Sequence, residues 1–159
     1  MSTNPYETYT PPEIGGLYIK LSDGQSVTLR IAGEPVVYEE TFERQGEDPR
    51  VSTRYAWKAL DVERQEPVIL QGGIRMFKDI ATLATNPNWG DPTKYDITIK
   101  RTGVELSTKY SITPIPNMEP LSSEAIEALT ELDLKEKVSA GKGVQHVYFI
   151  SEAIPDPKA

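Results

Sequence analysis

The chain has 159 residues, of which 38% are hydrophobic, and this length and content suit a single domain with one core. It contains no cysteine and one histidine, which excludes a disulfide framework, a thiolate metal site and a cysteine nucleophile. The net charge of −7 argues against a nucleic-acid partner, but the acidic excess lies before residue 17 and after residue 116. Residues 17–116 are nearly balanced, so nucleic-acid binding by this stretch stays open.

Residues 1–13 are expected to form a flexible leader. They are rich in proline and polar residues, and they contain neither a basic residue nor an apolar stretch, so they do not resemble a secretory signal. The chain also has no run of about 18 apolar residues, the length that a membrane-spanning helix needs. We therefore expect a protein of the cytoplasm, or of the host-cell cytoplasm if the chain is viral.

Alternating apolar and polar residues predict strands in the first half of the chain. A hairpin is expected from residues 17–21 and 27–31, and a third strand over 36–42. A fourth strand is expected over 51–62 and a short buried one over 67–70. Alternation places two sets of side chains on opposite faces of the fourth strand: Tyr55, Trp57 and Ala59 on one, and Arg54, Lys58 and Leu60 on the other.

A helix and a second hairpin are predicted next. Apolar residues fall on one face of a helix over 74–85, and the Asn-Pro pair after it ends the helix. Strands over 95–100 and 108–113 are then expected. A tight turn at Gly103-Val104 would place Ile97 opposite Tyr110, with Lys100 and Lys109 facing the same side.

From residue 117 the composition becomes acidic. Ser122 or Ser123 is expected to cap one helix over 124–137, and a glycine-containing linker and a short apolar stretch over 144–150 follow.

Together these elements predict a mostly β fold with two short helices, built as a small OB-like barrel of five to six strands. The predicted organisation is the leader 1–13, a barrel core over 14–116, and an acidic helix and C-terminal tail over 117–159.

Residues for catalysis are not evident in the sequence. There is no phosphate-binding loop of the Walker type, Gly72-Gly73 is best read as a tight turn, and the single histidine, His146, cannot form a triad or a metal site alone. The acidic clusters around residues 39–48 have no fixed ligand spacing and are typical of a solvated surface. We therefore expect a non-enzymatic protein without a metal or another cofactor.

Aromatic and basic residues alternate over 54–58, and this pattern admits two interpretations. Single-strand binding uses aromatic faces for bases and cations for phosphates. Alternation alone instead favours Tyr55 and Trp57 in the core, with Arg54 and Lys58 as solvated residues on the outer face.

A longer stretch resembles a known family. The loop Asn86-Pro87-Asn88-Trp89-Gly90-Asp91-Pro92, the strands Tyr95–Gly103 and Thr108–Pro114, and the preceding segments 55–61 and 69–80 are similar to a block found in phage single-stranded-DNA-binding proteins. These helix-destabilising replication proteins have an OB-fold core. The resemblance implies base stacking on Tyr55, Trp57 and Trp89. It implies phosphate contacts from six basic residues: Arg54, Lys58, Lys94, Lys100, Arg101 and Lys109.

The leading hypothesis is thus a phage-type protein that protects and organises single-stranded DNA in replication or recombination. The acidic region after residue 117 would contact replication or recombination proteins, in place of the dense acidic tail that many such proteins carry. The alternative is a non-enzymatic interaction module, such as a virion component or an inhibitor of a host factor, that offers its acidic surface to a basic partner.

Overall fold

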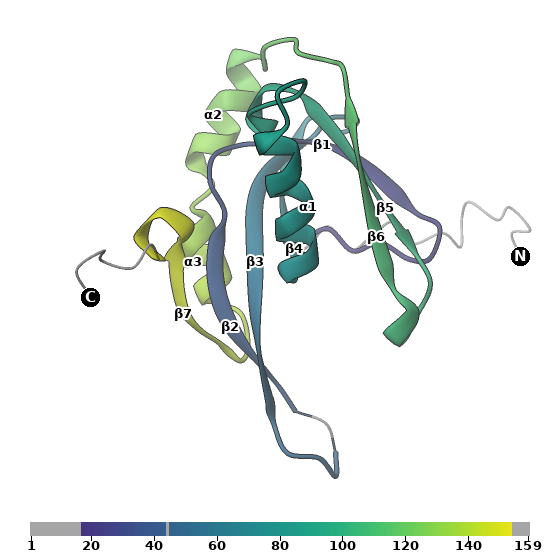
Figure 1. Ribbon diagram of the computed structural model, residues 1–159. Helices are drawn as coiled ribbons and strands as arrows, with labels where there is room; N and C mark the ends of the chain where they lie inside the picture. Colours follow the sequence, from purple (N-terminus) through teal and green to yellow (C-terminus); the bar gives the residue numbers. More distant parts are fainter. Residues whose placement is uncertain (1–16, 44, 154–159) are drawn as a thin grey trace, which may run out of the picture.

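The computed structural model describes residues 17–43 and 45–153, and in this part the chain is mostly β, as predicted (Figure 1). Seven strands form one antiparallel sheet with the order β6-β5-β1-β3-β2-β7, and β4 pairs with β3. The strands are β1 (Ser26–Ile31), β2 (Val36–Phe42), β3 (Arg50–Asp61), β4 (Glu66–Gly72), β5 (Asp96–Thr102), β6 (Lys109–Ile115) and β7 (Val144–Phe149). Three α-helices accompany them: α1 (Ile74–Thr85), α2 (Ser123–Glu131) and α3 (Leu134–Ser139). The sheet is open, so strand pairing does not close the predicted barrel. The expected leader 1–13 lies outside the described residues.

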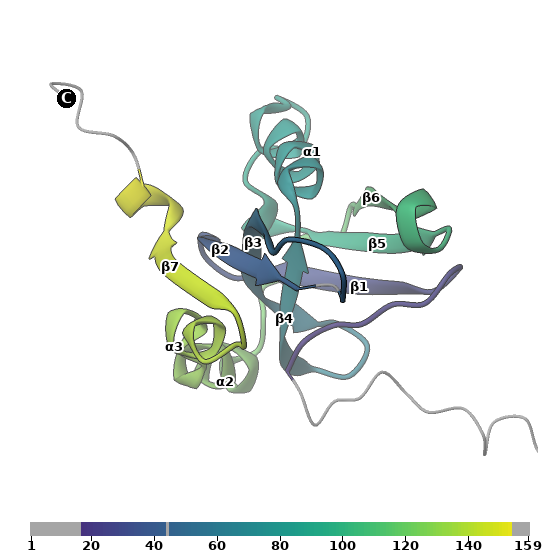
Figure 2. The ribbon, with the colours of Figure 1, turned by 90° about the horizontal axis from the view of Figure 1, so that it is seen from below.

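The long strand β3 organises the sheet. It pairs with β2 and then with β1 along one edge, and with β4 along the other. Because side chains alternate along a strand, β3 supplies two cores. Figure 2 shows α1 on one side of the sheet, and α2 and α3 on the opposite side.

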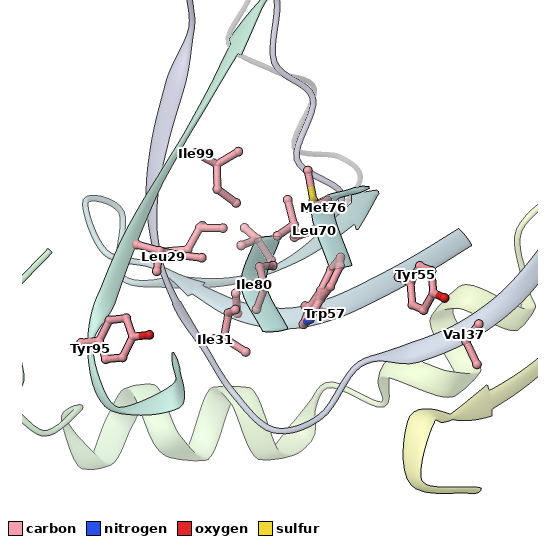
Figure 3. Close-up of a cluster of buried hydrophobic side chains, with 13 residues drawn as sticks. Leu29, Ile31, Val37, Tyr55, Trp57, Leu70, Met76, Ile80, Tyr95 and Ile99 are labelled. Atoms are coloured by element: carbon pink, nitrogen blue, oxygen red, sulfur yellow. The ribbon is translucent and has the colours of Figure 1, made fainter. Parts of the chain in front are cut away.

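The core beneath α1 is the larger one (Figure 3). Trp57 is 2% exposed and packs among residues of β1, β4, β5 and α1, including Leu29, Leu70, Ile80 and Ile99. α1 spans the predicted residues, because its apolar face matches the helical period and Asn86-Pro87 ends it.

The core on the other side includes the region after residue 117. Leu132, Leu134 and Val138 are buried against Val36, Tyr38 and Ile69, and β7 pairs with β2. The acidic helix predicted over 124–137 is two helices, separated at Leu132-Asp133, where the Asp133 side chain accepts a hydrogen bond from the Glu136 backbone N–H and starts α3. Residues of α2, α3 and β7 are therefore packed against β2 and β4 within the described part of the chain.

The predicted hairpin between residues 17–21 and 27–31 is wrong. Both edges of β1 are occupied, by β3 and β5, so no edge is left for the earlier segment. That segment lies beside β4 instead: the Ile19 N–H donates to the Ile69 carbonyl at 2.9 Å, and the Ile69 N–H donates to the Leu17 carbonyl at 2.7 Å.

The β5–β6 hairpin forms, but its predicted register is wrong. Ile97 lies opposite Pro114 rather than Tyr110, because the connection is not a tight turn and holds a short 3₁₀ helix, Glu105–Ser107. The connection begins at Gly103, whose φ of +87° and close approach to the Ser107 carbonyl oxygen leave no room for a Cβ atom. The shift is by an even number of residues, so the expected faces are retained.

A buried ion pair ties the segment after β6 to the sheet. Arg30 Nε donates to Asp96 Oδ1 at 2.8 Å, and both side chains are 4% exposed. The other guanidinium nitrogens of Arg30 donate to the carbonyls of Glu119 at 3.0 Å and Asn117 at 2.8 Å. Asn117 Nδ2 donates in turn to Asp96 Oδ2 at 2.8 Å, so both carboxylate oxygens have donors.

Among the described residues, none of the helices has the length and apolar character needed to cross a membrane.

Candidate nucleic-acid interface

Two of the predicted phosphate contacts are occupied by structural hydrogen bonds. Lys58 Nζ donates to the carbonyls of Leu129 at 2.6 Å and Leu132 at 3.1 Å, so it caps the C-terminal end of α2. Arg101 donates to the Leu21 carbonyl at 2.7 Å and to Thr108 Oγ1 at 3.3 Å. In this arrangement the Lys58 ammonium group is engaged by α2 and is not free to contact a phosphate. Arg101 mainly holds the base of the β5–β6 loop.

Replacement of Lys58 by methionine tests the capping role. It should lower the free energy of unfolding by roughly 1.5–3 kcal/mol, the usual contribution of hydrogen bonds from a charged donor. DNA affinity should be unchanged, as measured by denaturant unfolding and by titration of labelled oligo-dT. Lys100→Met, at an exposed position on β5, is the matched control and should leave stability unchanged. Normal stability with weakened DNA binding in Lys58→Met would instead identify Lys58 as a phosphate contact.

The predicted stacking residues of β3 are in the core. Tyr55 is 8% exposed and Trp57 is 2% exposed, and the Tyr55 ring stacks on Phe77 with 4.5 Å between the ring centroids. The expected stacking of bases on Tyr55 and Trp57 is therefore corrected, because neither ring offers a free face to a base in this conformation. The interpretation from alternation, which placed both rings in the core, holds.

Trp89 is half-buried, although the sequence suggested an open loop. The Asn86–Gly90 segment folds back on the end of α1, with the Gly90 N–H donating to the Asn86 carbonyl at 2.8 Å. The Trp89 ring lies 5.1 Å from the Tyr95 ring, tilted by 52°, and contacts the core beneath α1. Contacts with Tyr95 and with the core thus cover much of the surface of the Trp89 side chain.

Asp91 carries a fixed charge next to Trp89. The Thr93 backbone N–H donates to Asp91 Oδ1 at 2.9 Å and the Thr93 hydroxyl at 2.7 Å. These two donors, assisted by the nearby Lys94, hold the pKa of Asp91 below its usual range. The carboxylate beside Lys94 makes this end of the molecule a poor track for phosphates.

Arg54 is partly exposed and lies near Gly73, the residue before α1. Its Nε is 3.8 Å from a carboxylate oxygen of Glu40 and has no hydrogen-bond partner within the described part of the chain. The guanidinium is thus held loosely by one acidic neighbour.

The remaining predicted contacts are exposed but do not form one cluster. Lys94 lies in the short 3₁₀ helix Pro92–Lys94 before β5, whereas Lys100 lies near the far end of that strand. Lys109 is opposite Thr102, so Lys100 and Lys109 share a face of the sheet, as predicted.

A groove opens between the start of α1 and β6, beside Lys109. It has a volume of about 570 Å³, within the range of ligand pockets. Its lining residues are Gly73, Arg75, Met76, Asp79, Thr102, Thr108, Lys109, Tyr110 and Ser111. The Tyr110 ring is 38% exposed and follows Lys109 in sequence, with Arg75 across the groove on α1.

The groove can hold a planar ring together with an anion. Tyr110 offers an aromatic face and Arg75 and Lys109 offer positive charge. Thr102 at the end of β5, Thr108 before β6 and Ser111 on β6 add hydroxyl groups. The N-terminal end of α1 adds partial positive charge, because no side chain caps it and its first turn holds no acidic residue. Asp79 is the acidic residue of the lining.

Tyr110 and Arg75 were missed from the sequence. Alternation places Tyr110 on the apolar face of its strand, and no sequence pattern singles out Arg75. The Lys109-Tyr110 pair is the sequence feature that could have indicated this site, because it repeats the adjacency of aromatic and basic residues seen over 54–58.

A second hollow lies on the other flank of α1 and is mainly apolar. It measures about 510 Å³ and includes Trp57, Phe77 and Ile80 in its wall, with Glu34 and Asp91 as its charged members. A lining whose charges are carboxylates does not suit phosphate. Within residues 17–43 and 45–153, no cluster of three or more acidic or histidine side chains is placed to hold a metal ion.

Comparisons with known proteins assign no relative to the chain. No protein-family model matches it, and neither a characterised protein nor a solved structure does. Its function is therefore argued from its own residues.

Proposed function

We propose that the protein binds single-stranded DNA without catalysis, through the groove between α1 and β6. The observation that carries this proposal is a groove whose lining includes the exposed Tyr110 and two cations, Arg75 and Lys109. A base would stack on Tyr110, and the adjoining phosphates would contact the two cations. β6 is the edge strand of the sheet, so a DNA strand that passes over this edge would contact Tyr110 on one face and Lys109 and Lys100 on the other.

The strand connectivity supports an OB-like arrangement for this role. β1 and β2 follow one another along one edge of β3, and α1 connects β4 to β5. OB folds are partly open five-stranded barrels that bind oligonucleotides on the second and third strands and on two loops, one of which joins the fourth and fifth strands. When β1 and β2 together are compared with the first OB strand, β5 and β6 correspond to the fourth and fifth strands. The β5–β6 connection is then the second of these loops, and Thr102 and Thr108 at its base line the groove.

The acidic side of the molecule supports a second, separate contact. Exposed carboxylates on α2 and α3 include Glu124, Glu127, Glu131 and Glu136, and these helices lie across the sheet from α1 (Figure 2). DNA and a basic protein partner could then bind at the same time. We infer that replication or recombination proteins bind the acidic side of the molecule. If the protein bound a basic partner but no DNA, the alternative function as a non-enzymatic interaction module would be favoured instead.

Replacement of Tyr110 by alanine should weaken binding of single strands about tenfold, since one base–aromatic stack contributes about 1–3 kcal/mol. Fluorescence anisotropy with labelled oligo-dT, duplex DNA and RNA measures this directly. Wild type should prefer single strands to duplex and should lose affinity as salt rises.

Tyr148→Ala is the matched control for this measurement. Tyr148 is 37% exposed, close to the 38% of Tyr110, but lies on β7 at the opposite edge of the sheet. It should bind DNA normally. Equal affinity of the wild type for duplex and single strands, or equal effects of both tyrosine replacements, would refute the proposal.

A further inference from the structure

The tip of the β5–β6 hairpin displays two aliphatic side chains to solvent. Leu106 is 99% exposed and Val104 is 57% exposed. The hairpin projects from the body of the molecule at the lower right of Figure 1. The two residues are separated in sequence by Glu105. A leucine so fully exposed contributes nothing to the core and is available to a partner.

The tip is held in a defined conformation. The Gly103 N–H donates to Asp23 Oδ1 at 2.8 Å, and the Ser107 N–H donates to the Val104 carbonyl at 2.9 Å. Arg101 fixes the base of the connection through its bonds to Leu21 and Thr108. The aliphatic pair is therefore presented by an ordered turn that is fastened to a different part of the chain.

Positive charge lies directly below the tip. Thr102 and Lys109 form the last pair of the hairpin, and Lys100 lies two pairs further along, on the same face. The groove with Tyr110 begins at the same level, since Thr102 and Thr108 line it. A partner that meets the tip and the groove together must offer anionic groups next to apolar surface, and a nucleic-acid strand with separated bases does so.

We propose that Val104 and Leu106 form an apolar wedge that inserts between neighbouring bases where a single strand leaves a duplex. This inference rests on the proposed function, because the strand in the groove is what brings the duplex end to the tip. Aliphatic wedges that enter a base step separate the stacked bases and open or bend the duplex. The wedge assigns strand separation to the tip and strand binding to the groove.

The test is a forked duplex with a single-stranded oligo-dT tail, labelled with a fluorophore and a quencher at the fork. Wild type should lower the melting temperature of the fork. The double variant Val104→Ser/Leu106→Ser should lose most of that shift while its affinity for oligo-dT stays unchanged. Because both side chains are exposed, its own thermal unfolding should match that of wild type.

Ile126→Ser is the matched control, since Ile126 is 52% exposed on α2, across the sheet from the groove. It should retain the full fork opening. A double variant that opens forks like wild type overturns the wedge and leaves the proposed function standing. A wild type that binds no single strands overturns both. Loss of binding to phosphatidylglycerol vesicles in the double variant, with fork opening intact, overturns the wedge in favour of a lipid contact.

Discussion

Replacement of Asp96 by alanine is expected to lower the free energy of unfolding by about 3–5 kcal/mol, because it leaves the Arg30 guanidinium buried without its counter-ion. Arg30 and Asp96 are each 4% exposed, so water cannot take the place of the lost carboxylate. Asn117 loses the acceptor of its side-chain amide in the same step. The segment that Arg30 fastens through two carbonyls should loosen as well. Denaturant unfolding followed by circular dichroism measures the change.

The exposed pair Lys135–Glu152 provides the control for this prediction. Its atoms are 3.3 Å apart, but the side chains are 41% and 49% exposed, so solvent screens the pair. Lys135→Ala should therefore change stability little. If Asp96→Ala is no more destabilising than Lys135→Ala, the buried pair is not what anchors residues 117–119.

Reversal of the two groove cations, in the double variant Arg75→Glu/Lys109→Glu, is expected to lower affinity for oligo-dT about a hundredfold or more at low salt. Two attractive contacts are lost and two like charges face the phosphates, an arrangement that costs several kcal/mol. The slope of log affinity against log salt should shrink by about 1.4, since each phosphate contact to a single strand contributes about 0.7. Both residues are exposed, so the fold should be unaffected.

Lys137→Glu/Lys142→Glu is the control, because it changes the net charge of the protein by the same amount at exposed positions in and after α3. It should alter affinity far less than the groove variant. Equal losses in the two double variants would show that overall charge governs binding, and the groove would then have no special part in it.

Local sequence patterns were enough to predict the bounds of elements that can be recognised without knowing which strands pair with them. The helical period over 74–85 and the Asn-Pro stop gave the bounds of α1, and the run of residues that follows Pro35 gave the bounds of β2. The hairpin at 17–31 failed because nearness in sequence was taken as pairing, while β1 pairs with β3 and β5. The sheet's last strand, β7, belongs to a short apolar stretch that does not show which strand it joins.

The sequence directed attention to aromatic and basic residues for the candidate site, but it did not identify which of them line the groove. Sequence identifies the cations, but whether a cation is free depends on contacts across the fold. Lys58 is bound by the end of a helix that comes 71 residues later, whereas Lys109 remains exposed beside the groove. Alternation correctly placed Trp57 in the core, and the resemblance alone made it a stacking residue.

β2 completes its pairing late in synthesis, because its outer neighbour β7 comes last among the described strands. Other contacts are similarly distant: Arg30 reaches Glu119 across 89 residues, and the Tyr18 hydroxyl donates to the Lys137 carbonyl across 119. Closing such long loops costs entropy before any contact forms, so sheets of this kind fold in milliseconds to seconds rather than microseconds. During that interval the outer edge of β2 is open to strands of other nascent chains, and the arrival of β7 ends this route to aggregation.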